Sequence, residues 1–240
     1  MNVVQKKSGD LSLNSKPVTV TVDGERRVSA LLDAPRDARA CYVLAHGAGA
    51  GMKHPFMGAV AKGLFERNIA TLRYQFPYME QRLKRPDRPE LAQATVRAAT
   101  EEASRLLPGV ALFAGGKSFG GRMTSQAQAA LPLAGVHGLA FLGFPLHPAG
   151  VPSDERAKHL SQVKIPMLFL QGTRDALANL EVLEPVMQRL GSGATLRLFE
   201  EADHSFHVPA RTGRKDSEIM AELLDVLVAW METVISHNHS

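Results

Sequence analysis

A serine between two pairs of glycines has the surroundings in this chain that most favour chemistry. Residues 115–121 read Gly-Gly-Lys-Ser-Phe-Gly-Gly and directly follow the apolar run 110–114. This is the G-x-S-x-G pattern of a nucleophile elbow, a sharp turn from a strand into a helix. The glycines two residues before and two residues after the serine carry no Cβ and leave room for such a strained turn. The pattern predicts that Ser118 is a nucleophile and that the Phe119 amide, at a helix start, faces a developing oxyanion.

The same residues include Gly-Lys-Ser, which also ends the P-loop pattern G-x-x-x-x-G-K-[ST] of phosphate-binding proteins. That pattern requires a glycine at position 111, where this chain has Ala111. The spacing therefore excludes a P-loop.

A carboxylate and an imidazole follow later segments of strand character. Asp175 comes after the apolar run 165–170, and His204 comes after the alternating segment 194–199. A neutral histidine can take the proton of a serine hydroxyl, while an aspartate fixes its tautomer and stabilises the imidazolium. The chain order Ser118, Asp175, His204 therefore predicts a catalytic triad.

Neighbouring polar residues leave alternatives open. Asp203 adjoins His204 as a rival acid, and His207 is a rival base three residues further on. Lys117 and Arg122 flank the nucleophile and could bind a substrate carboxylate or phosphate, or only pair with nearby loops.

A glycine-rich loop upstream supplies the remaining part of an acyl-transfer site. Residues 46–52 read His-Gly-Ala-Gly-Ala-Gly-Met after the apolar segment 40–45. Such a loop after the third strand provides the second oxyanion N–H. We expect the Ala48 amide to act with that of Phe119, with Gly49 as the alternative, and His46 to be structural.

These motifs require a scaffold in which strands alternate with helices. An opening hairpin turns at Asp23-Gly24 and precedes strands separated by helical patterns, which implies an α/β fold with a mostly parallel, eight-stranded, doubly wound sheet. Strands are expected at 17–22, 26–32, 40–45, 69–74, 110–114, 137–143, 165–170 and 194–199. Helices are expected at 55–67, 90–106, 118–131, 179–190 and 216–236.

The pocket is expected to be open, with a minimal cap or none. The stretch 146–164 is too short for a lid of several helices and has room for one short helix at 153–162. Apolar or amphipathic residues near strand ends are candidates for the pocket wall, although each also fits the core. The predicted wall consists of Met52, Tyr74, Phe76 and Phe144, with Phe56, Tyr78 and Leu146 as further candidates.

Composition agrees with one enzyme domain over residues 17–236, after a flexible lead-in at 1–16. The chain has 240 residues, 45% of them hydrophobic, a formal net charge of +4 and one cysteine, Cys41. A lone cysteine fits a reducing compartment, and the polar lead-in does not resemble a signal peptide, so we expect a cytoplasmic protein. The charges are scattered rather than gathered in one patch, so we expect no nucleic-acid partner. The chain has no apolar run of about 18 residues, so we expect no membrane span. The histidines lack the spacing of metal ligands, so we expect no metal.

The chain resembles small α/β-hydrolases of the dienelactone-hydrolase-like group over about residues 17–235. The strings HGAGAGM, RYQFPYME, GGKSFGGRM, QGTRDAL and ADHSFH resemble more specifically a branch that includes a testis-expressed protein and a regulatory subunit of a chromatin acetyltransferase complex. Dienelactone hydrolase itself has a cysteine at the elbow, where this chain has Ser118, so its substrate is not carried over.

The triad and the resemblance together predict a serine hydrolase that cleaves esters or thioesters of small to medium acyl groups, without a cofactor. A peptidase or C–C hydrolase would use the same triad. A non-catalytic interaction module of the same fold is the alternative from another class, since some members of the branch are complex subunits. The substrate and the oligomeric state do not follow from the sequence, because function depends on the site rather than the fold.

Overall fold

The protein folds around one large mixed sheet. The structure is a computed structural model that describes residues 15–237. Within this range eight strands form a sheet in the order β1-β2-β4-β3-β5-β6-β7-β8. The strands β3 to β8 run parallel, whereas β1 and β2 form an antiparallel hairpin that joins the sheet beside β4. The bounds are β1 Lys16–Val22, β2 Arg26–Asp33, β3 Ala40–Ala45, β4 Ile69–Tyr74, β5 Ala111–Lys117, β6 Val136–Leu142, β7 Met167–Gly172 and β8 Ala194–Phe199.

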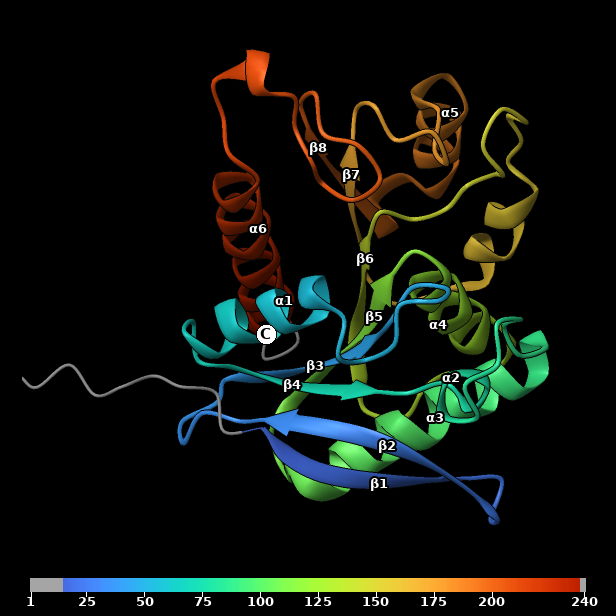
Figure 1. Ribbon diagram of the computed structural model, residues 1–240, viewed down its shortest axis with the longest axis vertical. Helices are drawn as coiled ribbons and strands as arrows, with labels where there is room; N and C mark the ends of the chain where they lie inside the picture. Colours follow the sequence, from blue (N-terminus) through green and yellow to red (C-terminus); the bar gives the residue numbers. More distant parts are fainter. Residues whose placement is uncertain (1–14, 238–240) are drawn as a thin grey trace, which may run out of the picture.

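Helices cover both faces of this sheet, as the doubly wound prediction requires (Figure 1). The helices α1 and α6 pack together on one face, and α3, α4 and α5 pack on the other. The bounds are α1 Pro55–Phe65, α2 Pro77–Glu80, α3 Pro89–Leu106, α4 Phe119–Ala130, α5 Leu180–Leu190 and α6 Asp216–His237. Short 3-10 helices lie at η1 Glu155–Gln162, η2 Gly191–Gly193 and η3 Ala210–Thr212.

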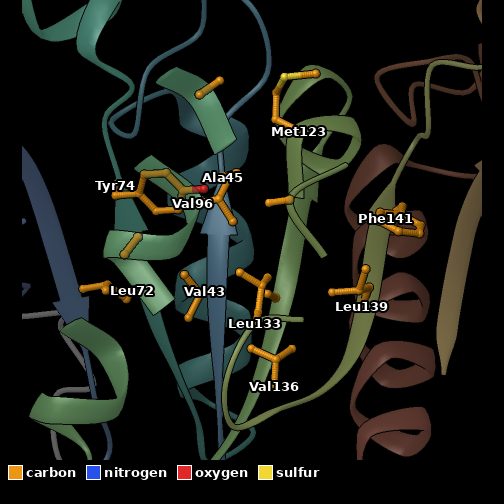
Figure 2. Close-up of a cluster of buried hydrophobic side chains, with 14 of the residues drawn as sticks. Val43, Ala45, Leu72, Tyr74, Val96, Met123, Leu133, Val136, Leu139 and Phe141 are labelled. Carbon is orange, nitrogen blue, oxygen red and sulfur yellow. The ribbon is translucent and has the colours of Figure 1, made fainter. Parts of the chain in front are cut away.

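The central strands are apolar throughout because both of their faces are buried. In β3, Tyr42 and Leu44 pack toward α1 and α6, while Val43 and Ala45 pack toward α3 and α4. Successive side chains of a strand point to opposite faces, so a strand between two helix layers reads as one continuous apolar run. Figure 2 shows part of the core between the sheet and the helices α3 and α4. In it, Val43 and Ala45 lie among apolar side chains of neighbouring strands and helices.

The expected strand ends shift by one to three residues, for identifiable reasons. The strand β5 continues to Lys117 because Gly115 and Gly116 stay in the ladder with β3, pairing with Leu44 and Ala45. The strand β7 begins at 167 rather than 165, after Pro166, which has no N–H to donate to a ladder. The first strand begins at Lys16, and the predicted lead-in lies, apart from residues 15 and 16, outside the described residues.

The connection from β6 to β7 carries no lid. Its only helical segment is η1, close to the expected short helix. A hydrogen bond of 2.7 Å between Ser125 Oγ and His159 Nε2 ties η1 to α4. The connection therefore has no cap of several helices. Among the described residues, no helix is long and apolar enough to cross a membrane.

Candidate active site

The turn between β5 and α4 holds Ser118 in a conformation that a side chain rarely adopts. Its backbone has φ 50° and ψ −116°. A Cβ at Gly116 would lie 2.1 Å from the Ala45 carbonyl oxygen, and one at Gly120 would lie 2.6 Å from that of His46. These contacts confirm that both glycines are required for the elbow, because β3 passes directly beside it.

The strained φ at the elbow should cost stability, so we expect Ser118→Gly to be more stable than Ser118→Ala. Both variants lose the hydroxyl, but only glycine adopts this backbone conformation freely, and strain of this kind costs roughly 1–3 kcal/mol. The flexibility of glycine in the unfolded chain offsets part of the gain, which leaves about 1 kcal/mol. Urea denaturation measures the difference, and a glycine variant no more stable than the alanine variant would show that the elbow is unstrained.

The structure brings Ser118, His204 and Asp175 into one hydrogen-bonded chain. Ser118 Oγ lies 2.9 Å from His204 Nε2, and His204 Nδ1 lies 2.7 Å from Asp175 Oδ2. A carboxylate only accepts, so Nδ1 carries the proton and Nε2 is free to accept the serine proton. The three residues come from the ends of β5, β7 and β8, which lie at one edge of the sheet.

The Asp175 carboxylate is buried and held by two further donors. The Leu177 amide donates to Oδ1 at 2.8 Å, and Gln171 Nε2 donates to Oδ2. The other end of the Gln171 amide accepts from the Phe144 N–H at 2.9 Å, which links β7 to the exit of β6. Sequence reasoning missed Gln171, although a polar residue at the end of an apolar strand was a signal that could have revealed it.

The rival acid and base have other partners. Asp203 accepts from the backbone amides of Ser205 and His207, at 2.7 and 3.0 Å, and so shapes its own loop. The His207 ring is exposed and lies 2.8 Å from Asp216 at the start of α6, where the hydrogen bond to that carboxylate raises the pKa of His207. Neither side chain contacts Ser118 in the described structure.

The amides of Ala48 and Gly49, in the loop after β3, differ in their hydrogen bonding. The Gly49 N–H donates to the Tyr78 hydroxyl at 2.9 Å, whereas the Ala48 N–H has no partner within residues 15–237. His46 is fully buried, accepts from the Phe76 amide at 3.1 Å, and has its pKa lowered by burial to about 4. This geometry favours Ala48 over Gly49 as an oxyanion donor and makes His46 a neutral support of the loop.

Because the Tyr78 hydroxyl is the only anchor that the Gly49 amide has in the described structure, we expect Tyr78→Phe to loosen the loop. The Ala48 amide would then be placed less accurately, and kcat should fall by roughly 10-fold. This loss is smaller than the ~100-fold loss that follows when a catalytic group is misplaced by a full ~1 Å. The variant Tyr42→Phe is a matched control, since the Tyr42 hydroxyl donates to the Ala140 carbonyl at 2.7 Å inside the core. Equal kcat losses in the two variants would indicate a general packing defect instead.

A cavity of about 540 Å³ opens beside Ser118 and His204. Its walls combine the glycine-rich loop after β3, the start of α1, the elbow, and the loops after β7 and β8. The lining residues are Gly47, Ala48, Ala50, His54, Phe56, Met57, Lys117, Ser118, Leu177, His204 and Ser205. The volume of this cavity and its mostly apolar lining are typical of a site for a small molecule.

The four residues that the sequence predicted in the pocket wall do not line this cavity. Met52, Tyr74, Phe76 and Phe144 are all at least 95% buried and belong to the interior instead. The rings of Tyr74, Phe76 and Phe144 point into the core on the α3 and α4 face of the sheet. Of the further candidates, Phe56 lines the cavity, whereas Tyr78 and Leu146 do not.

The two cations that flank the nucleophile have different positions. Lys117 lines the cavity and donates to the His204 carbonyl. Arg122 is half-buried on α4 and lies toward Arg156 rather than in the cavity wall, and burial together with that second cation lowers its pKa. Within the described ranges, no group of three or more His, Cys, Asp or Glu side chains is suited to hold a metal ion.

Solved structures of similar fold cover nearly the whole chain. A dienelactone hydrolase from Anabaena variabilis matches with a TM-score of 0.73 and 21% identity, covering 92% of this chain and 98% of that one. An α/β serine hydrolase without lid from Xanthomonas campestris matches with a TM-score of 0.69 and 21% identity, covering 90% and 94%. An esterase from Pyrococcus furiosus matches with a TM-score of 0.70 and 15% identity, covering 92% and 95%. At these identities the likeness shows the fold.

The family follows from the sequence match. A family model described as an alpha/beta hydrolase domain matches residues 38–232, which is more than half of the chain. This range includes the elbow, the oxyanion loop and the loops after β7 and β8. The chain therefore belongs to the α/β-hydrolase family.

Proposed function

We propose that this α/β-hydrolase is a serine hydrolase that cleaves esters or thioesters of small to medium acyl groups. The observation that carries the proposal is the hydrogen-bonded chain from Ser118 through His204 to Asp175 at the wall of an apolar cavity. A buried aspartate behind a neutral imidazole is the arrangement that activates a serine hydroxyl. A scaffold protein would not require it.

The mechanism has two halves. His204 Nε2 takes the proton of Ser118 while Oγ attacks the acyl carbonyl, and the oxyanion is held by the amides of Ala48 and Phe119. The protonated imidazole then gives its proton to the leaving alcohol or thiol as the bond to the acyl carbon breaks. A water molecule then attacks the acyl carbon while it gives a proton to His204. The bond from that carbon to Ser118 Oγ breaks, the acid leaves, and the imidazolium returns its proton to Oγ. Asp175 orients the imidazole and stabilises the imidazolium in both halves.

The cavity supports the choice of substrate class. Phe56, Met57 and Leu177 form an apolar wall, and no carboxylate lies among the described lining residues. Such a wall favours an acyl chain over a charged peptide segment, because burying a charge without a partner is costly. A cavity of about 540 Å³ without a lid also admits a leaving group that extends into solvent.

The finer assignments rest on the sequence. We infer that residues 17–236 form a single catalytic domain which uses no cofactor or metal and acts on a small-molecule acyl substrate. The lone buried Cys41, whose pKa burial raises to about 12, fits a cytoplasmic protein. The motif strings also support membership in the branch that includes the testis-expressed protein and the acetyltransferase-complex subunit.

Labelling with a fluorophosphonate, read by intact mass, tests the proposed function. The wild type should gain one adduct that Ser118→Ala does not, and a panel of neutral esters and thioesters of increasing acyl length should then show turnover. An unlabelled, folded wild type would contradict the proposal and favour an interaction module of the same fold. Labelling together with turnover of peptides alone would indicate a peptidase.

A further inference from the structure

Lys117 immediately precedes the proposed nucleophile, and its ammonium group lies inside the site. The side chain leaves the end of β5, whose backbone pairs with Leu142 of β6. Its Nζ donates a hydrogen bond to the backbone carbonyl oxygen of His204. The last residue of β5, which precedes the serine, is therefore bonded to the loop residue that carries the imidazole, 87 positions away in the sequence.

The surroundings of Lys117 hold the ammonium in this one place. Nζ lies 5.8 Å from the centre of the Phe56 ring and 5.5 Å from that of Phe206, within the range of cation–π attraction. A Cβ at Gly143 would lie 2.8 Å from Nζ, so the glycine at the exit of β6 leaves the space that the ammonium occupies. The stem of Lys117 passes Gly47 of the oxyanion loop, where a Cβ would lie 3.5 Å from Cγ.

The charge of Lys117 is in an apolar environment. Burial lowers the pKa of Lys117 to about 8, and the carboxylates of Asp175 and Asp203 partly oppose this effect. A surface lysine would keep its ammonium in water, because removing the charge from solvent is costly without partners. The triad chemistry described above does not use this group, which leaves its position to be explained.

We propose that Lys117 is a positioning residue that ties the His204 loop to the nucleophile elbow and so keeps Nε2 within hydrogen-bonding distance of Ser118 Oγ. The inference rests on the proposed function and extends it. A hydrogen bond to the His204 carbonyl fixes the backbone from which the imidazole projects, while Asp175 fixes only the far edge of the ring. Without the ammonium, the loop keeps the ring contacts of Phe206 with Phe56 and Phe199 but loses its direct bond to the elbow.

Lys117→Met tests this role, because methionine keeps an unbranched apolar stem and removes the donor. On a neutral ester we expect kcat to fall about 100-fold, the cost of misplacing a catalytic group by about 1 Å. KM should stay nearly unchanged, since the cavity wall is otherwise intact. The low-field proton resonance of His204 Nδ1, observed without substrate, should broaden or shift as the imidazole loses its fixed position. The matched control is Lys158→Met, an exposed lysine of η1, which should change none of these values.

Restoring the amine chemically distinguishes loss of the hydrogen bond to the His204 carbonyl from a general disturbance of the fold. The variant Lys117→Cys, alkylated with 2-bromoethylamine, regains an amine of nearly the original length, and we expect at least 10-fold recovery of kcat. Alkylation with a neutral reagent of similar size should give no recovery. Selectivity is favoured because Cys41, the only native cysteine, is fully buried.

Several results would overturn the positioning role. A normal kcat and an unchanged Nδ1 resonance in Lys117→Met would do so, as would a KM that rises only for substrates with a carboxylate in the acyl group. The second result would make Lys117 a substrate-binding residue. If the wild type shows neither labelling nor turnover, the proposed function fails, but the resonance still reports whether Lys117 holds His204.

If Lys117→Met does not fold, the wild type itself supplies the test. As pH rises through about 8, Lys117 loses its proton and its bond to the His204 carbonyl loses the assistance of the charge, so kcat should fall. The other titratable groups that face this site are Asp175, Asp203, His204 and His54. A kcat that stays flat over the pH range in which Lys117 is observed to lose its proton would overturn the proposal.

Discussion

Ester hydrolysis should be abolished by Ser118→Ala, with the fold intact. Ser118 Oγ is the only hydroxyl that His204 Nε2 contacts in the described structure, at 2.9 Å. Loss of the nucleophile in a triad enzyme lowers kcat on the order of 10⁶-fold, and the oxyanion amides and the binding site account for the residual rate. Alanine tolerates the elbow backbone about as well as serine, so the variant should unfold at nearly the wild-type temperature.

Hydrolysis of a chromogenic short-chain ester measures this effect, with circular dichroism as the check on folding. Ser161→Ala is a suitable control because Ser161 is exposed on η1, and within residues 15–237 its hydroxyl bonds only to the Lys158 carbonyl, at 3.1 Å. It should retain full activity. Turnover by a folded Ser118→Ala protein would rule out the acyl-enzyme mechanism.

Asp175→Asn should lower kcat by about 10⁴-fold, the loss known for this change in a serine triad. The Leu177 amide donates to Oδ1 of the carboxylate, and both His204 Nδ1 and Gln171 Nε2 lie at Oδ2. An asparagine keeps its oxygen toward the Leu177 amide and turns its NH₂ group toward the imidazole. Nδ1 must then accept instead of donate, so the proton moves to Nε2 and the ring can no longer take the serine proton.

The comparison with Asp203→Asn makes this prediction specific. Asp203 accepts hydrogen bonds from two backbone amides of its own loop, a role that an asparagine oxygen can also fill. That variant should therefore keep kcat within a few-fold of the wild type. A larger loss in Asp203→Asn than in Asp175→Asn would reverse the assignment of the acid.

The sequence predicted the scaffold well because apolar periodicity and strand burial are coupled. Strands buried on both faces read as continuous apolar runs, and the helices between them require parallel strands. Parallel strands end at a common edge of the sheet, so residues just past the ends of β5, β7 and β8 had to meet. Ser118, Asp175 and His204 satisfy this condition in the structure, and the glycines of the elbow mark where β3 passes too close for a Cβ.

The tertiary structure alone decided which side chains face the cavity. Met52, Tyr74, Phe76 and Phe144 stand near strand ends, yet their side chains point into the core, while Phe56 of α1 lines the wall. Proximity in sequence to a strand end does not say which way a side chain turns. That direction depends on how α1 and the loops dock against the sheet.

The same reason applies to the polar contacts around the triad. The Gly49 amide donates to Tyr78, the Phe144 amide to Gln171 and the Lys117 ammonium to the His204 carbonyl, and each of these bonds joins segments far apart in the chain. Composition and periodicity report burial and local conformation, but not the direction of a single donor. The sequence therefore determined the order of the elements and the edge at which the site forms, whereas the packing of the loops decided the pocket and the placement of Lys117.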